Sequence, residues 1–213
     1  LETLEPRLLM SADLIPVAGS IDLPGETDFY TFTLAEERTI LFDALTPDSR
    51  FNWSLEGPGG QVVGATRFDG SDGAQGGQLI ALEAGNYRMA IDAEGDFTGA
   101  YQFRLINIEN ADVIALGDTV DGVLETAGRE SDLFRFDATE GQELVFDAQA
   151  VSGGTAYWSL VGPDGVACSA VCAGCSSAGG CSAGGCGLLC LSRASTRALL
   201  VSAGRRSGCN SRA

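Results

Sequence analysis

The chain has 213 residues, a formal net charge of −16 and 45% hydrophobic residues, and it contains neither histidine nor lysine. Without these two residue types it cannot build a Ser-His-Asp triad, a Cys-His pair, a Schiff base or a Ser-Lys dyad. A surface this acidic also repels nucleic acid and anionic membrane surfaces. Among the 29 Asp and Glu residues, a catalytic carboxylate pair is the enzymatic option that remains, and ordinary solvated charges are the favoured interpretation.

Residues 1–15 are predicted to form a separate N-terminal segment. They contain the run LEPRLLMSAD, from Leu4 to Asp13, ahead of the first predicted strand. Neither this segment nor any later part of the sequence has an apolar run long enough to cross a bilayer. We therefore expect no membrane insertion and no nucleic-acid partner.

Residues 16–110 show the period of two that is typical of β-strands. Apolar residues alternate with polar ones, which places one set on a buried sheet face. The buried set is predicted to include Tyr30, Phe32, Phe42, Trp53, Leu55, Tyr87 and Phe103. Gly-rich turns separate seven or eight such segments and no helix is predicted, so the fold class is an all-β antiparallel sandwich with a jelly-roll or Ig-like layout.

Two features of this first module suggest ligands. The loop FDGSDGAQGG places Asp69 and Asp72 in a flexible, Gly-rich segment, and hard oxygen ligands of this kind suit Ca²⁺. The spacing matches neither an EF-hand nor an RTX nonapeptide, and ordinary loop acids are the alternative. Trp53 is a candidate platform for a sugar ring, although its place in the inward alternation favours a core position. Calcium binding and carbohydrate binding are therefore alternative predictions for this module.

The same strand pattern occurs a second time in residues 111–165. The segment TDFYTFTLAEERTILFDAL, from Thr27, matches SDLFRFDATEGQELVFDAQ, from Ser131, without a gap. WSLEGPGG and WSLVGPDG then repeat around the two tryptophans of the chain, Trp53 and Trp158. Phe134 and Phe136 are predicted to point inward like their counterparts in the first copy.

The second copy departs from the pattern at about Gly165. Counterparts of LIALEAGNYRMAID and AYQFRL are absent from the sequence that follows. The second module is therefore predicted to be truncated, with half a core and at most a loose sheet.

Residues 166–213 differ in composition from everything before them. All 29 acids and eight of the thirteen Arg lie in residues 1–165, a net charge of −21, whereas the last 48 residues carry +5, all seven Cys and no aromatic residue. We interpret this tail as an out-of-frame translation or, failing that, a disordered segment. A metal site built on Cys168, Cys172 and Cys175 and a disulfide-stapled domain are weaker alternatives, because the spacing and the odd number of Cys suit neither.

The order TDFYTFTL, WSLEGPGGQVV, LEAGNYRMAID and GAYQFRL resembles the bacterial pre-peptidase C-terminal domain, a β-sandwich appended to exported peptidases and other exoproteins. The resemblance covers Ser20 to Ile108 once and Gly122 to about Gly165 in part. LEPRLLMSAD is similar to the LEPR-x-LL motif near the amino end of very large bacterial surface proteins, with Met10 where that pattern has Leu.

These resemblances imply a non-catalytic structural or adhesive module of a large protein that is secreted or held at the bacterial cell surface. The expected partners are further modules of the same protein and a surface glycan or protein. A calcium-binding accessory domain and a carbohydrate-binding module remain the alternatives. An enzyme with a carboxylate pair is the least favoured.

Overall fold

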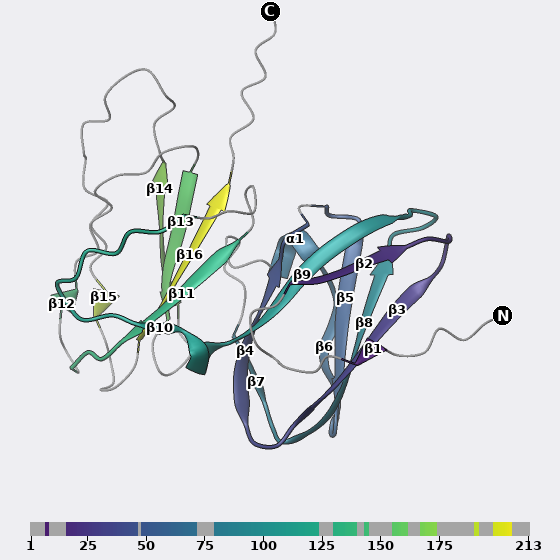
Figure 1. Cartoon of the computed structure of the whole chain (residues 1–213), viewed down its shortest axis with the longest axis horizontal. Helices are drawn as coiled ribbons and strands as arrows, with labels where there is room; N and C mark the ends of the chain where they lie inside the picture. Colours follow the sequence, from purple (N-terminus) through teal and green to yellow (C-terminus); the bar gives the residue numbers. More distant parts are fainter. Residues whose placement is uncertain are drawn as a thin grey trace, which may run out of the picture. The chain divides into compact units, whose positions relative to one another are not determined.

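The computed structural model describes most of the chain up to residue 139 and several separate strands after it. The described residues are 7–8, 16–46, 48–71, 79–123, 130–139, 143–144, 155–161, 167–173, 190–191 and 198–205. They fall into two compact units, Leu1–Asn110 and Ala111–Ala213 (Figure 1). No helix among the described residues is long and apolar enough to span a membrane.

The first unit contains two sheets. One sheet has five strands in the order β1 (Arg7–Leu8), β3 (Thr27–Leu34), β8 (Gly85–Ala93), β5 (Phe51–Gly57), β6 (Gly60–Arg67). The other has four strands in the order β2 (Val17–Ile21), β9 (Gly99–Asn107), β4 (Arg38–Ala44), β7 (Ile80–Leu82). A single helical turn, α1 (Phe68–Ser71), follows β6, and a 3₁₀ turn, η2 (Ile108–Asn110), follows β9. Apart from β1, the paired strands of this unit are antiparallel.

The core of the first unit lies between these two sheets. Along β3 the residues alternate between buried and partly exposed, with Tyr30, Phe32 and Leu34 inside. Period-two alternation turns every second side chain to the same face, so each strand adds one row to the core. All seven residues predicted for the core are buried, which confirms the β-sandwich fold class.

Aromatic rings from both sheets contact one another in the core. The ring of Phe42 on β4 stacks on Trp53 of β5, with 4.1 Å between centroids and 6° between planes. Phe68 of α1 is completely buried and meets Phe42 edge-on. The sequence predicts Phe68 in a loop. The one-turn helix and the buried ring of Phe68 correct this prediction. A residue that follows a strand and precedes Asp-Gly is predicted from the sequence to lie in a turn. Only the tertiary packing shows that the ring of Phe68 fills space between the two sheets.

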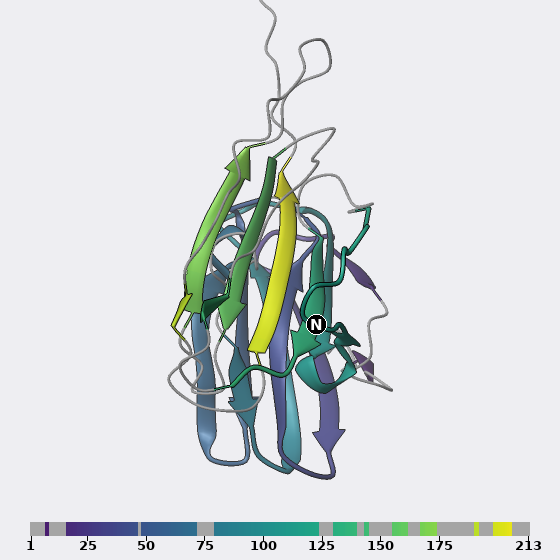
Figure 2. The same ribbon diagram turned by 90° about the vertical axis from the view of Figure 1, so that its left-hand side faces the viewer.

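The second unit contains two sheets among its described residues. Its larger sheet has the order β10 (Asp112–Val113), β11 (Ser131–Phe136), β16 (Ala198–Arg205), β13 (Thr155–Val161), β14 (Ala167–Ala173). A two-stranded sheet pairs β12 (Glu143–Leu144) with β15 (Cys190–Leu191). In Figure 2, β14, β13 and β16 lie side by side. β11 and β13 are the second and fourth strands of this sheet, as their sequence counterparts β3 and β5 are in the five-stranded sheet of the first unit.

The structure of this unit differs from the sequence-based prediction in two ways. The tail was expected to be disordered, yet residues 167–173, 190–191 and 198–205 form strands, and β16 lies between β11 and β13, where β8 lies in the first unit. The run ALLVS at the start of β16 has the β-branched and aliphatic residues that suit a central strand.

The second difference concerns the inward row of β11. Phe136 is buried as expected, whereas Phe134 is half-buried and Leu133 is buried instead. Leu133 and Phe134 are adjacent apolar residues, so alternation in the sequence could not select the buried face.

Phe42→Ala is expected to lower the free energy of unfolding of the first unit by about 3–5 kcal/mol, because it removes the ring that stacks on Trp53 and leaves a cavity. Chemical denaturation followed by tryptophan fluorescence measures the change. The control Leu23→Ala removes a side chain that is 67% exposed and should change stability by less than about 0.5 kcal/mol. Equal effects of the two substitutions would contradict this description of the core.

Candidate functional site

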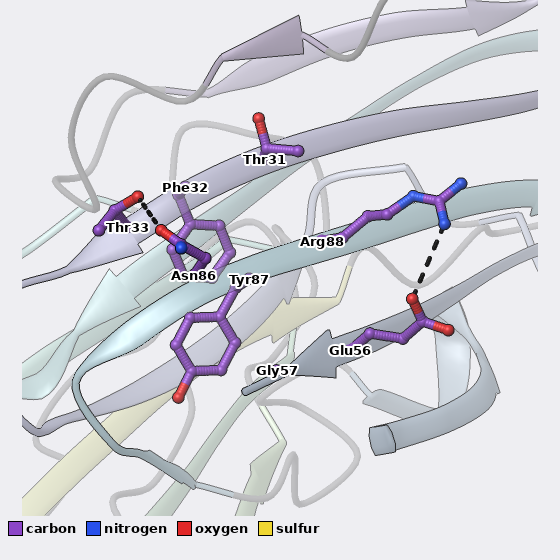
Figure 3. Close-up of a pocket in the computed structure, with 8 residues that line it drawn as sticks. All are labelled: Thr31, Phe32, Thr33, Glu56, Gly57, Asn86, Tyr87 and Arg88. Carbon is purple, nitrogen blue, oxygen red and sulfur yellow. Dashed lines mark hydrogen bonds and ion pairs between the residues drawn. The ribbon is translucent and has the colours of Figure 1, made fainter. Parts of the chain in front are cut away.

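A shallow hollow lies on the face of the five-stranded sheet that points away from the core. Its volume is about 450 Å³. β3, β8 and β5 supply its lining, and the polar members occupy the positions between buried core residues. Figure 3 shows the lining residues, which are Thr31, Phe32, Thr33, Glu56, Gly57, Asn86, Tyr87 and Arg88.

Cross-strand contacts position the polar side chains of the hollow. The hydroxyl of Thr33 donates to Oδ1 of Asn86 at 2.8 Å, across the β3–β8 pairing (Figure 3). The guanidinium of Arg88 lies 3.8 Å from a carboxylate oxygen of Glu56 and 3.8 Å above the centroid of the Phe29 ring. Because the side chains of Arg88 and Glu56 are 50% and 63% exposed, water screens this pair, and Arg88 remains accessible to a ligand.

The hollow presents polar side chains at the sheet surface. It offers the hydrogen-bonding groups of threonine, asparagine and arginine, together with one carboxylate, that of Glu56. Acid-base hydrolysis of a glycoside needs two carboxyl groups that flank the scissile bond. The hollow therefore suits recognition of a polar ligand.

A second polar cluster, Asp28 with Tyr30 and Tyr101, is closed to solvent. The hydroxyl of Tyr101 on β9 donates to the carboxylate of Asp28 on β3, and it lies 2.7 Å from the hydroxyl of Tyr30. All three residues are at most 3% exposed. These contacts join the two sheets, so Asp28 has a structural role.

Gly19 on β2 leaves the space that this cluster needs. A Cβ at Gly19 would lie 2.3 Å from the Tyr101 hydroxyl and 2.7 Å from that of Tyr30. Separations under 3 Å force a backbone or ring to move. The backbone of Gly19, paired with Tyr101 in the ladder, is thus part of the packing of the two phenols.

A buried ion pair connects two strands of the other sheet. Nε of Arg104 on β9 donates to Oδ2 of Asp43 on β4 at 2.8 Å, and the two residues face each other in the β4–β9 register. Asp43 lies between the core residues Phe42 and Ala44, so its side chain points to the opposite face of the sheet. Asp43 aligns in sequence with Asp147, but its partner could not be predicted from the sequence, because the pairing depends on strand register.

The calcium candidates are only partly described. Asp69 lies on α1, where its carboxylate forms an ion pair with Arg67 at 3.1 Å. Asp72 lies outside the described residues. Within the described ranges no group of three or more His, Cys, Asp or Glu side chains could hold a metal ion. Of the tail cysteines considered for a metal, Cys168 and Cys172 are on β14 and Cys175 is outside the described residues.

Trp53 has no exposed ring face for a sugar. It is 2% exposed, stacks on Phe42, and donates from Nε1 to the hydroxyl of Ser71 at 2.8 Å. The core position favoured by its alternation is confirmed. Carbohydrate recognition through Trp53 is thereby excluded, and a glycan would have to bind elsewhere on the module.

The sequence matches no protein-family model and no curated protein.

Tyr101→Phe is expected to lower the free energy of unfolding by about 1–3 kcal/mol, since it leaves the buried carboxylate of Asp28 without the hydroxyl that donates to it. Tyr87→Phe is the matched control, because its hydroxyl donates at 2.8 Å to the backbone oxygen of Glu83 near the surface, and its loss should cost about 1 kcal/mol or less. Chemical denaturation at pH 7 compares the two variants.

The same phenol makes stability depend on alkaline pH. Burial, together with the hydrogen bonds to Asp28 and Tyr30, raises the pKa of Tyr101 well above its ordinary value of 10.0. Its contribution is fully present below about pH 10 and declines as pH rises further, because only the unfolded tyrosine then releases its proton. In Tyr101→Phe the alkaline slope should become shallower by roughly 1.4 kcal/mol per pH unit, and an unchanged slope would contradict the burial of this hydroxyl.

Calcium binding through the loop predicts a rise in melting temperature on addition of millimolar Ca²⁺. The rise should disappear in the double variant Asp69→Ala, Asp72→Ala and persist in the control Asp92→Ala, which removes an exposed acid of β8. Thermal unfolding with and without calcium measures it. The absence of any rise, or an equal rise in the double variant, would remove calcium from consideration.

Proposed function

We propose that the chain is a non-catalytic structural or adhesive module from a large protein that is secreted or held at the bacterial cell surface. The main supporting observation is the repetition of one sheet arrangement. β3, β8, β5 and β6 in the first unit correspond in order to β11, β16, β13 and β14 in the second. Successive units with one sheet arrangement suit a spacer or a multivalent surface, because each unit adds length and a sheet face without new chemistry.

The sequence motifs support export. LEPRLLMSAD is similar to the LEPR-x-LL motif of large bacterial surface proteins, and the strand segments resemble the pre-peptidase C-terminal domain. The partners that follow from this proposal are further modules of the same protein.

The hollow on the outer sheet face supports the adhesive part of the proposal. Arg88, Asn86 and Thr33 present donors and acceptors to solvent, and the half-buried ring of Phe29 lies beneath the guanidinium. Hydroxyl-rich or carboxylate-bearing ligands match these groups, because arginine and amide side chains bind both. A surface polysaccharide fits this description, as does an acidic protein segment.

The adhesive role predicts binding of the whole chain to immobilised neutral or uronic-acid-containing polysaccharides, measured by biolayer interferometry. Arg88→Ala should weaken that binding at least about tenfold, the cost of one charge-assisted hydrogen bond. Arg50→Ala is a close control: Arg50 is 53% exposed, forms an ion pair with Asp48 and lies 3.6 Å above the Phe97 ring, outside the hollow.

Equal losses in the two arginine variants would contradict a site in the hollow. Binding to none of the polysaccharides would leave the protein-ligand and spacer roles. Release of reducing sugar that disappears in Glu56→Gln would overturn the non-catalytic proposal.

A further inference from the structure

Both units contain a short parallel strand at the same edge of the larger sheet. β1 pairs with β3 through Arg7↔Tyr30 and Leu8↔Thr31. β10 pairs with β11 through Asp112↔Phe134 and Val113↔Arg135. These two are parallel, whereas the other strand pairs in the described residues are antiparallel.

The two parallel pairs have the same register. In the sequence repeat Tyr30 corresponds to Phe134 and Thr31 to Arg135. The short strand that enters each unit therefore meets its sheet at equivalent residues. A parallel partner cannot come from a tight hairpin and needs a longer connection. In the first unit that connection runs through β2, which belongs to the opposite sheet. Because a parallel pair in the same register occurs in both units, we attribute it to the module rather than to a local turn preference.

The sequences of the two entering segments are also alike once the register is known. In this register RLLMSADLI, from Arg7, aligns in sequence with DVIALGDTV, from Asp112. Each segment contains two consecutive aliphatic residues. An Asp lies four residues after the second of these, and a further aliphatic residue follows the Asp. This likeness was not visible from the sequence alone, because one residue is inserted between the entering segment and the strand it meets.

The backbone contacts of the second unit define the edge position. The amide of Ile114 donates to the oxygen of Arg135 at 3.0 Å. The N–H and C=O of one strand residue point to the same side, so the amide of Arg135 also faces β10. Immediately afterwards, the side chain of Asp118 accepts from the amide of Ala115 at 2.9 Å, and the chain turns. Because Thr31 corresponds to Arg135, we expect the backbone of Thr31 to face β1 in the same way.

We propose that this edge of the module is a docking site for the chain segment that enters it, and that the LEPR-x-LL-like segment is the occupant of that site in the first module. The partner is an extended strand with two consecutive aliphatic residues, added by main-chain pairing. In the second module the occupant is the connector that follows η2. The occupied position covers part of a sheet edge that would otherwise present unpaired backbone groups. This inference concerns the architecture of the repeat and does not depend on the ligand of the module.

The test compares three versions of the full chain by amide hydrogen exchange, resolved by NMR. One is the natural sequence, one replaces residues 7–10 (RLLM) by DVIA from residues 112–115, and one replaces them by GSGS. The readout is the Thr31 amide, with the Phe32 amide, which faces β8, as internal reference. DVIA should preserve Thr31 protection within about threefold, and GSGS should accelerate Thr31 exchange at least about tenfold relative to Phe32.

Two outcomes would overturn the proposal. Unchanged Thr31 exchange with GSGS would show that the segment does not dock. Acceleration by DVIA as large as that by GSGS would show that the two entering segments are not equivalent. Ile114→Pro provides a second measurement, because proline removes the amide that donates to Arg135. The Arg135 amide should then exchange at least about tenfold faster than that of Phe136, and no difference would argue against the same site in the second module.

Discussion

The face-to-face packing of aromatic rings between two sheets is the constraint on which the first module depends. Phe42 comes from the four-stranded sheet and Trp53 from the five-stranded sheet, and their stacked rings fix the distance between the layers. Tyr30 and Phe103 meet edge-on between the same sheets, with 5.4 Å between centroids. Large rings bury much apolar area with few rotatable bonds, so a small domain gains most of its stability from such contacts.

The same packing determines where polar groups can lie. At Asp28, the carboxylate is tolerated inside because a phenol from the opposite sheet donates to it. At Asp43, the carboxylate is paired with Arg104 on the neighbouring strand. The unpacked outer face of β3 and β8 keeps its polar residues in water, and these supply the candidate ligand site. The core, the internal polar contacts and the polar outer face thus follow from one alternation of side chains along the strands.

The second unit shows how tolerant a central strand position is. β11 and β13 correspond to β3 and β5 of the first module, but the strand between them, β16, comes from a segment with a different composition. Each of the two flanking strands offers an open row of backbone groups to this position, and a run of aliphatic residues is enough to fill it. The order of the sheet can therefore persist where the sequence repeat has ended.

The sequence alone was sufficient for the fold class and for the core positions Phe32, Phe42 and Trp53, because alternation with period two encodes which side chains turn inward. It was not sufficient for Phe68, whose burial depends on a one-turn helix, nor for Leu133, whose neighbour is equally apolar. The pairing of Asp43 with Arg104, the hollow at Arg88 and the shared edge register of Arg7 and Asp112 were decided only by the tertiary structure. Each of these joins residues from different strands, and strand order and register arise from packing the whole module rather than from any local pattern.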